Sequence, residues 1–370
     1  MSQITQAPEQ TQDCDQAGLF ALRGLPPAVF AFGFSFRKRA IVRRFLANVQ
    51  VHFVFRTKNL PVGSVLLLWG STAVPEQTPQ YIRIVRLEDG FLRSVGLGAD
   101  LIHPVSWVID QSGIYYDARQ PSDLELLLLN TVFSGQLLAR AALLRERIVL
   151  SGLTKYNLGS LRWQRPSGVL TVILVPGQVE TDASIYFGAV GITGNLALLQ
   201  TVRRANPDAY IVYKPHPDVV AGLRAQGQGE SAAKQWCDEL VVDSAMQEML
   251  NQVDEVHVMT SLTGFEALLR GIKVVCYGQP FYAGWGLSDD VIPVTRRHRL
   301  LSLDELVAAS LILYPTYVSR RTGKITTPEQ ALDELVAWRS GEQKTKNAIY
   351  GISWWRKIMR IGLRIRGRSR

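Results

Sequence analysis

Short apolar runs bounded by turn residues recur along the chain and predict β-strands. Residues 28–46 begin the pattern with a strand, a tight turn at Gly33 and a helix. Four further runs, apolar and partly β-branched, follow it: "VQVHFVF" at 49–55, "SVLLLWG" at 64–70, "YIRIVRL" at 81–87 and "VSWVIDQ" at 105–111. Strands of this kind predict a covered, mostly parallel sheet.

The second half restarts the alternation after a helical stretch at 121–150 and a connection that carries Gly, Ser and Pro. Strands and helices from "VLTVILVPGQ" to "KVVCYG" predict βαβ units in a second parallel sheet. With 370 residues the chain is long enough for two domains. We predict an α/β fold in four parts: a polar leader, two Rossmann-like domains and a basic tail, at 1–24, 25–165, 166–340 and 341–370. Two sheets facing a cleft describe the GT-B architecture, although periodicity alone does not separate it from other paired-sheet enzymes.

Charge is unevenly distributed. The formal net charge is +9, yet residues 344–370 alone hold nine Lys or Arg and no acidic residue. The remaining 32 basic residues balance 32 acidic ones, so the globular body is neutral. As a helix, the tail would place Trp354, Trp355 and aliphatic residues opposite a basic face, which predicts an interfacial membrane anchor. A disordered or nucleic-acid-binding tail is the alternative, and the tryptophan pair favours lipid.

Neither secretion nor a membrane span is predicted. No run of about 18 apolar residues occurs, and the polar N-terminus does not resemble a secretion signal. We therefore expect the protein to stay in the cytoplasm. Cys14, Cys237 and Cys276 are far apart and form no CxxC pair, so we interpret them as small core residues.

Acidic residues follow two predicted strands. Glu88 and Asp89 come directly after one of them, with Arg93 close behind. Asp89 is open to interpretation as a helix cap or solvated loop residue, whereas Glu88 is the better candidate to point into a cleft. Asp182 either caps a short helix together with Ser184 or places a carboxylate where it can attack an anomeric carbon. The sequence leaves both interpretations of Asp182 open.

Cationic and hydroxyl side chains follow two strands of the second half. "AYIVYKPH" ends in Lys214 and His216, and a cation and an imidazole at a strand end suit a phosphate. Flanking prolines make this backbone rigid, and a polar turn is the alternative. A strand-to-helix junction that favours phosphate and ribose binding holds Thr260, Ser261, Thr263 and Glu266.

The loop "YGQPFYAGWGLSDD" at 277–290 is rich in glycine and aromatic residues, as sugar-facing loops often are. Core packing is the simpler explanation for Phe281 and Tyr282. Asp289 and Asp290 have no further metal-ligand types nearby, so we predict no bound metal. "GLG" at 96–98 lacks the third glycine of a dinucleotide fingerprint and is set aside.

Seven strings, in order from about Val29 to Thr327, resemble the capsule polysaccharide β-Kdo transferases of the KpsC type: "EDGFLRSVGLGADL", "GIYYDARQPSDLE", "TKYNLG", "VPGQVETDAS", "YKPHPDV", "MTSLTGFEALLRG" and "FYAGWGLSDD". The likeness is closest to the C-terminal of that family's two modules. It implies a GT-B enzyme that transfers Kdo, 3-deoxy-manno-octulosonic acid, from CMP-β-Kdo with retention of configuration. Typical members carry two modules and this sequence carries one, which leaves open a single linkage type or an isolated module.

The resemblance also implies residue roles. Asp182 is expected to be the nucleophile and Glu88 the acid or base, while a protonated His216 would stabilise the departing nucleotide. The residues expected to bind the donor are Arg93, Gln178, Lys214, Pro217, Thr260, Ser261 and Glu266. Kdo carries its own carboxylate, so the donor is a double anion whose charge Lys214 or Arg93 would offset without a metal or other cofactor.

The expected acceptor is a Kdo-terminated glycolipid of the phosphatidylglycerol type, in the poly-Kdo linker of capsular polysaccharide. The enzyme would meet it at the cytoplasmic face of the inner membrane of a Gram-negative bacterium, with 25–165 as the acceptor side and 166–340 as the CMP-Kdo side. No nucleic acid partner is expected. Two alternatives stay open: another CMP-sugar transferase, such as a sialyltransferase-like one, and a non-catalytic scaffold in capsule assembly.

Overall fold

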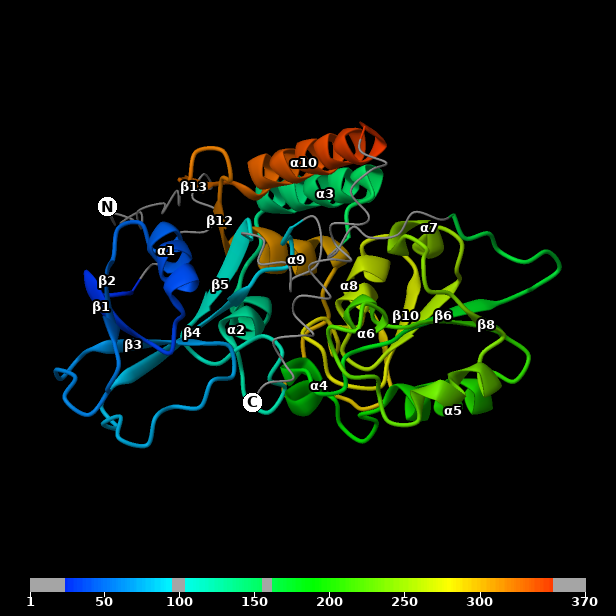
Figure 1. Ribbon diagram of the computed structural model, residues 1–370, viewed down its shortest axis with the longest axis horizontal. Coiled ribbons are helices and arrows are strands. Elements are labelled where there is room, and N and C mark those ends of the chain that lie inside the picture. The colour runs from blue at the N-terminus through cyan, green and yellow to red at the C-terminus, as the bar shows by residue number, and fades with distance from the viewer. Residues whose placement is uncertain (1–23, 95–103, 155–161, 349–370) are drawn as a thin grey trace, which may run out of the picture.

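Two β-sheets with flanking helices make up the protein (Figure 1). The computed structural model describes residues 24–94, 104–154 and 162–348. The predicted leader up to residue 23, with Cys14, the "GLG" at 96–98 and the tail beyond 348 lie outside these ranges. The α/β prediction is confirmed, because strands and helices alternate through both halves.

The first sheet has seven strands in the order β13-β12-β5-β4-β3-β1-β2. Their bounds are β1 (Ala28–Phe32), β2 (Gln50–Val54), β3 (Val65–Trp69), β4 (Arg83–Asp89), β5 (Ser106–Asp110), β12 (Pro315–Val318) and β13 (Ile325–Thr326). Strands β1 to β4 are parallel, but β5, β12 and β13 each run antiparallel to their neighbours. Among the five strands predicted for this half, β1 to β5, three of the four pairings are parallel, so the prediction of a mostly parallel sheet holds for them. The antiparallel strands β12 and β13 come from residues 315–326 and were not predicted.

The second sheet has six strands in the order β11-β10-β9-β6-β7-β8. They are β6 (Val172–Pro176), β7 (Tyr210–Lys214), β8 (Glu239–Leu240), β9 (Glu255–Val258), β10 (Lys273–Cys276) and β11 (Asp289–Asp290). Every pairing in this sheet is parallel, which confirms the prediction of a second parallel sheet.

Helices flank both sheets: α1 (Phe36–Phe45), α2 (Asp123–Asn130), α3 (Gly135–Ser151), α4 (Ala183–Gly188), α5 (Asn195–Ala205), α6 (Pro217–Val220), α7 (Met246–Leu250), α8 (Leu262–Leu268), α9 (Leu303–Val307) and α10 (Pro328–Ala348), with a 3₁₀ turn η2 (Glu230–Gln235) and a π turn η3 (Ala308–Leu313). The expected helical stretch at 121–150 is two helices, since Ser134 caps α3 by accepting a hydrogen bond from Leu137 N at 3.2 Å. Within the described ranges, no helix has the length and apolar character needed to cross a membrane.

The chain returns to the first sheet after it has built the second. Strand β12 pairs with β5, and α10 lies beside α3 (Figure 1), where Arg140 Nε is 2.8 Å from Glu329 Oε1. The segment expected as one domain at 166–340 therefore contributes to both sheets. The predicted domain limits themselves stay predictions.

One hydrophobic cluster is shared by both halves. It contains Phe91 of the first half together with Phe265 and Phe281 of the second, and the rings of Phe91 and Phe281 stack with centroids 4.4 Å apart. Cys276 is buried in the same cluster, as predicted for a small core residue, while Cys237 is half-buried. Close packing across the halves holds the two sheets together and gives the surface between them a defined shape.

Candidate active site

A cleft of about 760 Å³ lies between strand ends of both sheets. The last residues of four strands line it: Trp69 of β3, Asp89 of β4, Pro176 of β6 and Lys214 of β7. The carboxyl ends of strands are where open α/β sheets bind ligands. The cleft also brings together every site residue predicted from the sequence: Glu88, Arg93, Gln178, Asp182, Lys214, His216, Pro217, Thr260, Ser261 and Glu266.

Glu88 is held at the first-sheet side of the cleft. Its Oε1 accepts the backbone N–H of Asp89 at 2.9 Å, and its Oε2 accepts the hydroxyl of Tyr116 at 3.4 Å. A Cβ atom at Gly70 would lie 2.6 Å from Glu88 Oε2 and 2.7 Å from the Tyr116 hydroxyl. Because real Cβ atoms do not approach so closely, glycine at position 70 makes room for this carboxylate.

Asp89 is neither a helix cap nor a solvated loop residue. It ends β4, and its carboxylate accepts hydrogen bonds from Arg93 Nε at 2.6 Å and from Trp107 Nε1 at 3.2 Å. The side chain of Arg93 is 11% exposed and is paired with this carboxylate. Arg93 therefore lies in the cleft as predicted, but Asp89 already offsets its charge.

Asp182 occupies the N-cap position of α4, yet its side chain makes no capping hydrogen bond. Its Oδ2 accepts the hydroxyl of Ser184 at 2.7 Å, and the carboxylate lines the cleft. Burial, followed by the charge of Glu88, raises the pKa of Tyr115 and of Tyr116, and Asp182 adds a smaller effect on both. Glu88, Asp182 and the two tyrosines line the same cleft.

The cationic side of the cleft comes from the end of β7. Lys214 is 9% exposed, and its Nζ donates to the carbonyl of Val242 at 3.2 Å. Burial lowers the pKa of Lys214, and the charge of Asp243 opposes this shift. A buried ammonium bonded to a neutral carbonyl is well suited to an anionic ligand, because the ligand supplies the missing negative charge.

His216 caps α6, and Pro217 follows as the first residue of that helix. The His216 Nδ1 atom accepts the backbone N–H of Asp218 at 3.1 Å. This contact favours the neutral tautomer with its hydrogen on Nε2, which can donate to a phosphate. The same Nδ1 lies 4.0 Å from Asp218 Oδ2, a carboxylate that would pair with a protonated imidazole, so the predicted protonated form of His216 stays a prediction.

The turn between β9 and α8 forms the floor of the cationic side. Ser261 caps α8, with its Oγ accepting the N–H of Thr263 at 3.2 Å. Gln178 Nε2 donates to Thr260 Oγ1 at 3.0 Å, and Thr260 N–H donates to Gln178 Oε1 at 2.9 Å. Both polar atoms of the Gln178 amide are therefore engaged with Thr260, so Gln178 positions this turn instead of presenting a free amide to a ligand. Glu266 is buried one turn into α8 and also lines the cleft.

Three aromatic residues of the site were not predicted from the sequence. Trp69, Tyr115 and Tyr116 all line the cleft. The tyrosine pair belongs to the string "GIYYDARQPSDLE" and follows β5, which ends in Asp110. Their position just after a predicted strand was the available signal. Phe281 and Tyr282 are buried, which confirms core packing, although Phe281 also borders the cleft.

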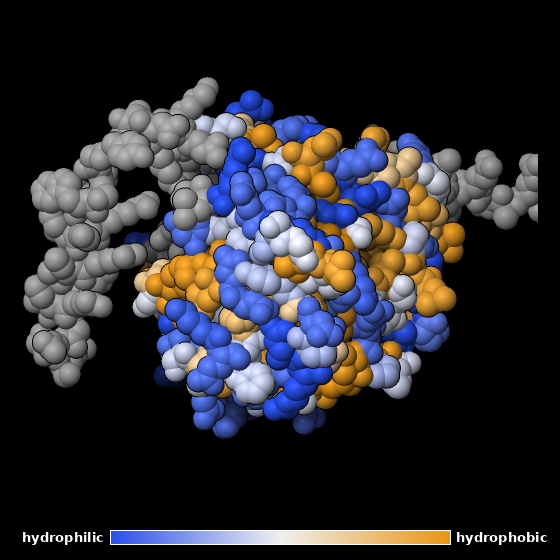
Figure 2. Space-filling model, turned by 90° about the vertical axis from the view of Figure 1, so that its right-hand side faces the viewer, coloured by the Kyte–Doolittle hydropathy of each residue, from blue (hydrophilic) through white to orange (hydrophobic). Residues whose placement is uncertain are grey.

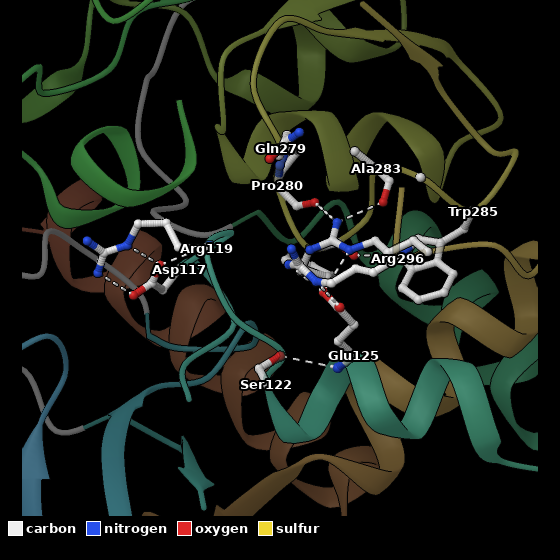
Figure 3. Close-up of polar contacts among 12 residues, drawn as sticks. Asp117, Arg119, Ser122, Glu125, Gln279, Pro280, Ala283, Trp285 and Arg296 are labelled. Carbon is white, nitrogen blue, oxygen red and sulfur yellow. Dashed lines mark hydrogen bonds and ion pairs between the residues drawn. The ribbon is translucent and has the colours of Figure 1, made fainter. Parts of the chain in front are cut away.

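An ionic cluster beside the cleft joins the two halves of the chain (Figure 3). Figure 3 shows Glu125 reaching from α2 to Arg296, and the same carboxylate also accepts a hydrogen bond from Arg297. Arg297 Nε lies 2.8 Å from Glu125 Oε2, and its Nη1 donates to the carbonyls of Pro280 and Ala283 at 2.6 and 2.8 Å. Since Pro280 lines the cleft, this cluster supports the cleft wall.

The two neighbouring aspartates predicted not to bind metal are engaged in the fold. Asp290 accepts hydrogen bonds from Gly284 N at 2.6 Å and from the Ser288 hydroxyl at 2.7 Å, and Asp289 lies 3.6 Å from Lys273 Nζ. Among the residues that the structure describes, no group of three or more His, Cys, Asp or Glu is arranged to hold a metal ion.

The sequence matches the family model described as capsule polysaccharide biosynthesis protein over residues 65–158 and 166–318. The capsule polysaccharide modification protein LipA of Neisseria meningitidis serogroup A is 42% identical over 343 residues, which are 90% of this chain and 49% of LipA. The lipopolysaccharide-processing protein LpsZ of Rhizobium meliloti is 37% identical over 85% of this chain and 76% of its own. The chain thus spans about half the length of LipA.

Two solved structures from Thermosulfurimonas dismutans are similar over most of this chain. The KpsC β-Kdo 2,7 transferase is 41% identical with a TM-score of 0.71, covering 84% of this chain and 99% of its own. The KpsC β-Kdo 2,4 transferase is 30% identical with a TM-score of 0.72, covering 83% of this chain and 97% of its own.

Proposed function

The chain belongs to the capsule polysaccharide biosynthesis protein family, and we propose that it is a retaining transferase that moves Kdo from CMP-β-Kdo to a Kdo-terminated glycolipid. Its likeness to two solved Kdo transferases, at 41% and 30% identity, supports the donor sugar. The observation that carries the proposal is that Glu88 and Asp182 share one cleft with Lys214 and His216. Glycosyl transfer with retention needs a carboxylate at the anomeric carbon and cationic or hydrogen-bond donors at the leaving group.

The proposed architecture is GT-B, with two Rossmann-like domains facing each other. The all-parallel second sheet ends in Lys214 and in the turn at Thr260, so we assign the nucleotide to this side. Glu88 and its tyrosine neighbours belong to the first sheet, so we assign the acceptor to that side.

In the first proposed step, the Asp182 carboxylate attacks the anomeric carbon of Kdo. The bond from that carbon to the phosphate oxygen breaks, and CMP leaves with the electron pair. Lys214 and the Nε2–H of His216 stabilise the negative charge that grows on the phosphate. We assign this stabilisation, and the charge compensation of the bound double anion, to protein groups and propose no metal ion.

In the second step, an acceptor hydroxyl attacks the same carbon and its proton passes to Glu88. The ester bond to Asp182 breaks and restores the carboxylate. Two inversions at one carbon leave the configuration unchanged. The Tyr116 hydroxyl orients Glu88 throughout, and its raised pKa keeps it a neutral donor.

We further propose that the linkage formed is β-2,7. The TM-scores against the two Kdo transferases are 0.71 and 0.72, so the overall fold does not distinguish them. The sequence identity supports the 2,7 linkage, because it is 41% with the 2,7 transferase and 30% with the 2,4 transferase over nearly equal shares of the chain.

The test is an incubation of purified full-length protein with CMP-Kdo and a synthetic Kdo-terminated glycolipid. We expect one added Kdo by mass spectrometry, and a β-2,7 bond by NMR. Asp182→Ala should abolish transfer, whereas Ser184→Ala, which removes only a hydrogen bond to that carboxylate, should retain most of it.

Three results would contradict the proposal in different ways. Turnover of CMP-sialic acid and not CMP-Kdo would indicate a different CMP-sugar transferase. Capsule production that persists in cells carrying Asp182→Ala would indicate a non-catalytic scaffold. A β-2,4 product would refute the linkage alone and leave the donor assignment intact.

We propose that the enzyme works at the cytoplasmic face of the inner membrane, because its proposed acceptor carries a lipid. The predicted membrane anchor at 341–370 extends beyond the described residues, which end at 348. Fusion of the full chain to a fluorescent protein, followed by fractionation of cell membranes, tests this location.

A further inference from the structure

A basic surface lies on α1 and on the segment 55–58 that follows the edge strand β2. Residues 24–75 hold seven Lys or Arg and no Asp or Glu: Arg37, Lys38, Arg39, Arg43, Arg44, Arg56 and Lys58. Within the described part of the chain, none of these seven cations forms an ion pair. The globular body is neutral in sum, but this stretch is strongly basic. At the opposite end of the molecule, formed by the second half, hydrophilic and hydrophobic residues are interspersed (Figure 2).

Two phenylalanines of the same surface point into solvent. Phe36 is 82% exposed and Phe55 is 78% exposed. The guanidinium carbon of Arg39 lies 4.6 Å from the ring centroid of Phe36 and 5.4 Å from that of Phe55, so cations and aromatic rings belong to one patch. Exposed apolar groups gathered within a charged rim mark an interaction site.

The stability of α1 explains only part of its charge distribution, since Arg43 and Arg44 in its last turn are favoured by the helix dipole. Its first turn holds Arg37, Lys38 and Arg39 and no acidic residue. A helix N-terminus carries a partial positive charge, so three cations there are unfavourable for the isolated helix. An external anionic surface would offset this repulsion.

We propose that α1 and the segment 55–58 after β2 form a membrane-binding surface, separate from the C-terminal tail, that lies on an anionic bilayer. The exposed cations face lipid phosphates, and the rings of Phe36 and Phe55 enter the boundary between headgroups and acyl chains. These cations are Arg37, Arg43, Arg44, Arg56 and Lys58. Basic residues together with exposed aromatic rings are the composition of interfacial membrane contacts. An acidic polysaccharide would satisfy the cations, but it would leave both rings largely in water, so the composition favours lipid.

Lys38 connects this surface to the cleft. Its Nζ lies 3.2 Å from the ring centroid of Trp69, which lines the cleft. The charges of Glu88 and Asp89 act on Lys38 and oppose the lowering of its pKa by burial. A bilayer against α1 would therefore adjoin the first-sheet side of the cleft, where a lipid-linked acceptor would enter. This last consequence rests on the proposed function, whereas the membrane contact does not.

The experiment is sedimentation of the full-length protein with vesicles of phosphatidylcholine, with and without phosphatidylglycerol. Two double variants are compared: Phe36→Ser with Phe55→Ser, and Arg37→Gln with Arg44→Gln. All four side chains are exposed, so both variants should fold. The tail is intact in each protein, and partition onto the anionic vesicles should fall about tenfold in both variants. The matched control is Val132→Ser with Leu170→Ser, which removes two apolar side chains that are 94% and 95% exposed outside this surface and should bind vesicles like the wild type.

Each other outcome overturns the proposal. Vesicle binding at the wild-type level by both double variants would mean that the tail alone makes the contact. A loss confined to the arginine variant would refute the insertion of the phenylalanines. Binding of soluble polygalacturonate that both variants lose, with unchanged vesicle binding, would identify an acidic polysaccharide as the occupant. None of these measurements uses transfer activity, so their results do not depend on whether the proposed function is correct.

Discussion

Gln178 and Thr260 hold each other through two hydrogen bonds that run in opposite directions, one from Gln178 Nε2 at 3.0 Å and one from Thr260 N–H at 2.9 Å. Gln178 is itself held by the buried Asn195, which accepts its N–H and donates to its carbonyl at 2.9 Å each. The loop after β6 and the turn after β9 are therefore fixed to one another, although they are far apart in the sequence.

Two substitutions of Gln178 should distinguish its role in positioning the Thr260 turn from the effect of a negative charge placed there. Gln178→Ala removes both contacts to Thr260, so we expect the free energy of unfolding to fall by about 1–3 kcal/mol and CMP to bind more weakly. Gln178→Glu still accepts the N–H of Thr260 and replaces the Nε2 donor by a second oxygen, to which the Thr260 hydroxyl can donate after rotation. It also adds a negative charge, so it should stay closer to wild-type stability and still bind CMP poorly. Urea unfolding and calorimetric titration with CMP measure the two effects. Equal affinity for CMP in wild type and Gln178→Glu would contradict a phosphate at this turn.

Lys214 should contribute to binding at a cost to stability. Burial lowers the pKa of Lys214, so the unfolded chain binds its proton more tightly than the folded protein does. The stability penalty is complete at pH values below the lowered pKa and is relieved as pH rises toward the ordinary value of 10.5. Lys214→Met should remove this penalty, leaving the apo protein as stable as wild type or more stable by about 1 kcal/mol near neutral pH, while CMP affinity falls at least about tenfold.

Thermal unfolding between neutral pH and pH about 10 checks this prediction. The matched control is Lys273→Met, because Lys273 is 53% exposed and its contact with Glu255 raises its pKa. That substitution should leave CMP affinity unchanged. A less stable Lys214→Met protein near neutral pH would show that the buried ammonium is not a burden to the fold.

Loss of the carboxylate at Glu125 should weaken the junction between the halves. Glu125→Ala leaves Arg297 buried and unpaired, since both side chains are 3% exposed, and should cost about 3 kcal/mol in the free energy of unfolding. Figure 3 also shows the pair Asp117 and Arg119, in which the arginine is 63% exposed. Arg119→Gln should change stability by less than about 0.5 kcal/mol. Similar urea midpoints for both variants would contradict the structural role of the Glu125 cluster.

Substitution of Gly70 should affect activity more than stability. Both Gly70 and Gly63 have positive φ, at +50° and +80°, so alanine at either position costs about 1–2 kcal/mol in backbone strain. Only at Gly70 does the new Cβ collide with Glu88, at 2.6 Å from Oε2, whereas nothing lies within 4 Å at Gly63. Gly70→Ala should therefore lower kcat by tenfold or more through displacement of Glu88, on the order of one catalytic proton transfer. Both variants carry the backbone strain, but only the Gly70 variant has the collision with Glu88. Transfer assays on the two variants, matched for stability, therefore show which of the two effects lowers activity.

Much of the site could be predicted because polar residues end otherwise apolar runs. Glu88 and Lys214 lie at the ends of their strands and Thr260 lies just after one, and all three strands were recognisable from their composition. The carboxyl ends of parallel strands meet at one edge of a sheet. Asp182 was harder, since a residue before a short helix is usually a cap, and the family resemblance supplied its role.

Other features depend on contacts that are distant in sequence. The reversed direction of β5 and the return of β12 to the first sheet depend on packing partners, which periodicity does not encode. The pairing of Gln178 with Thr260 spans 82 positions, so no local pattern contains it. The tautomer favoured at His216 depends on one backbone N–H, which became visible only with coordinates.

The return of β12 to the first sheet means that the backbone passes between the sheets twice, once between α3 and β6 and again between β11 and β12. A single linker would let two lobes swivel about many axes. Two crossings leave one easy rotation, about the line that joins them, so substrate entry and product release would share one hinge-like degree of freedom.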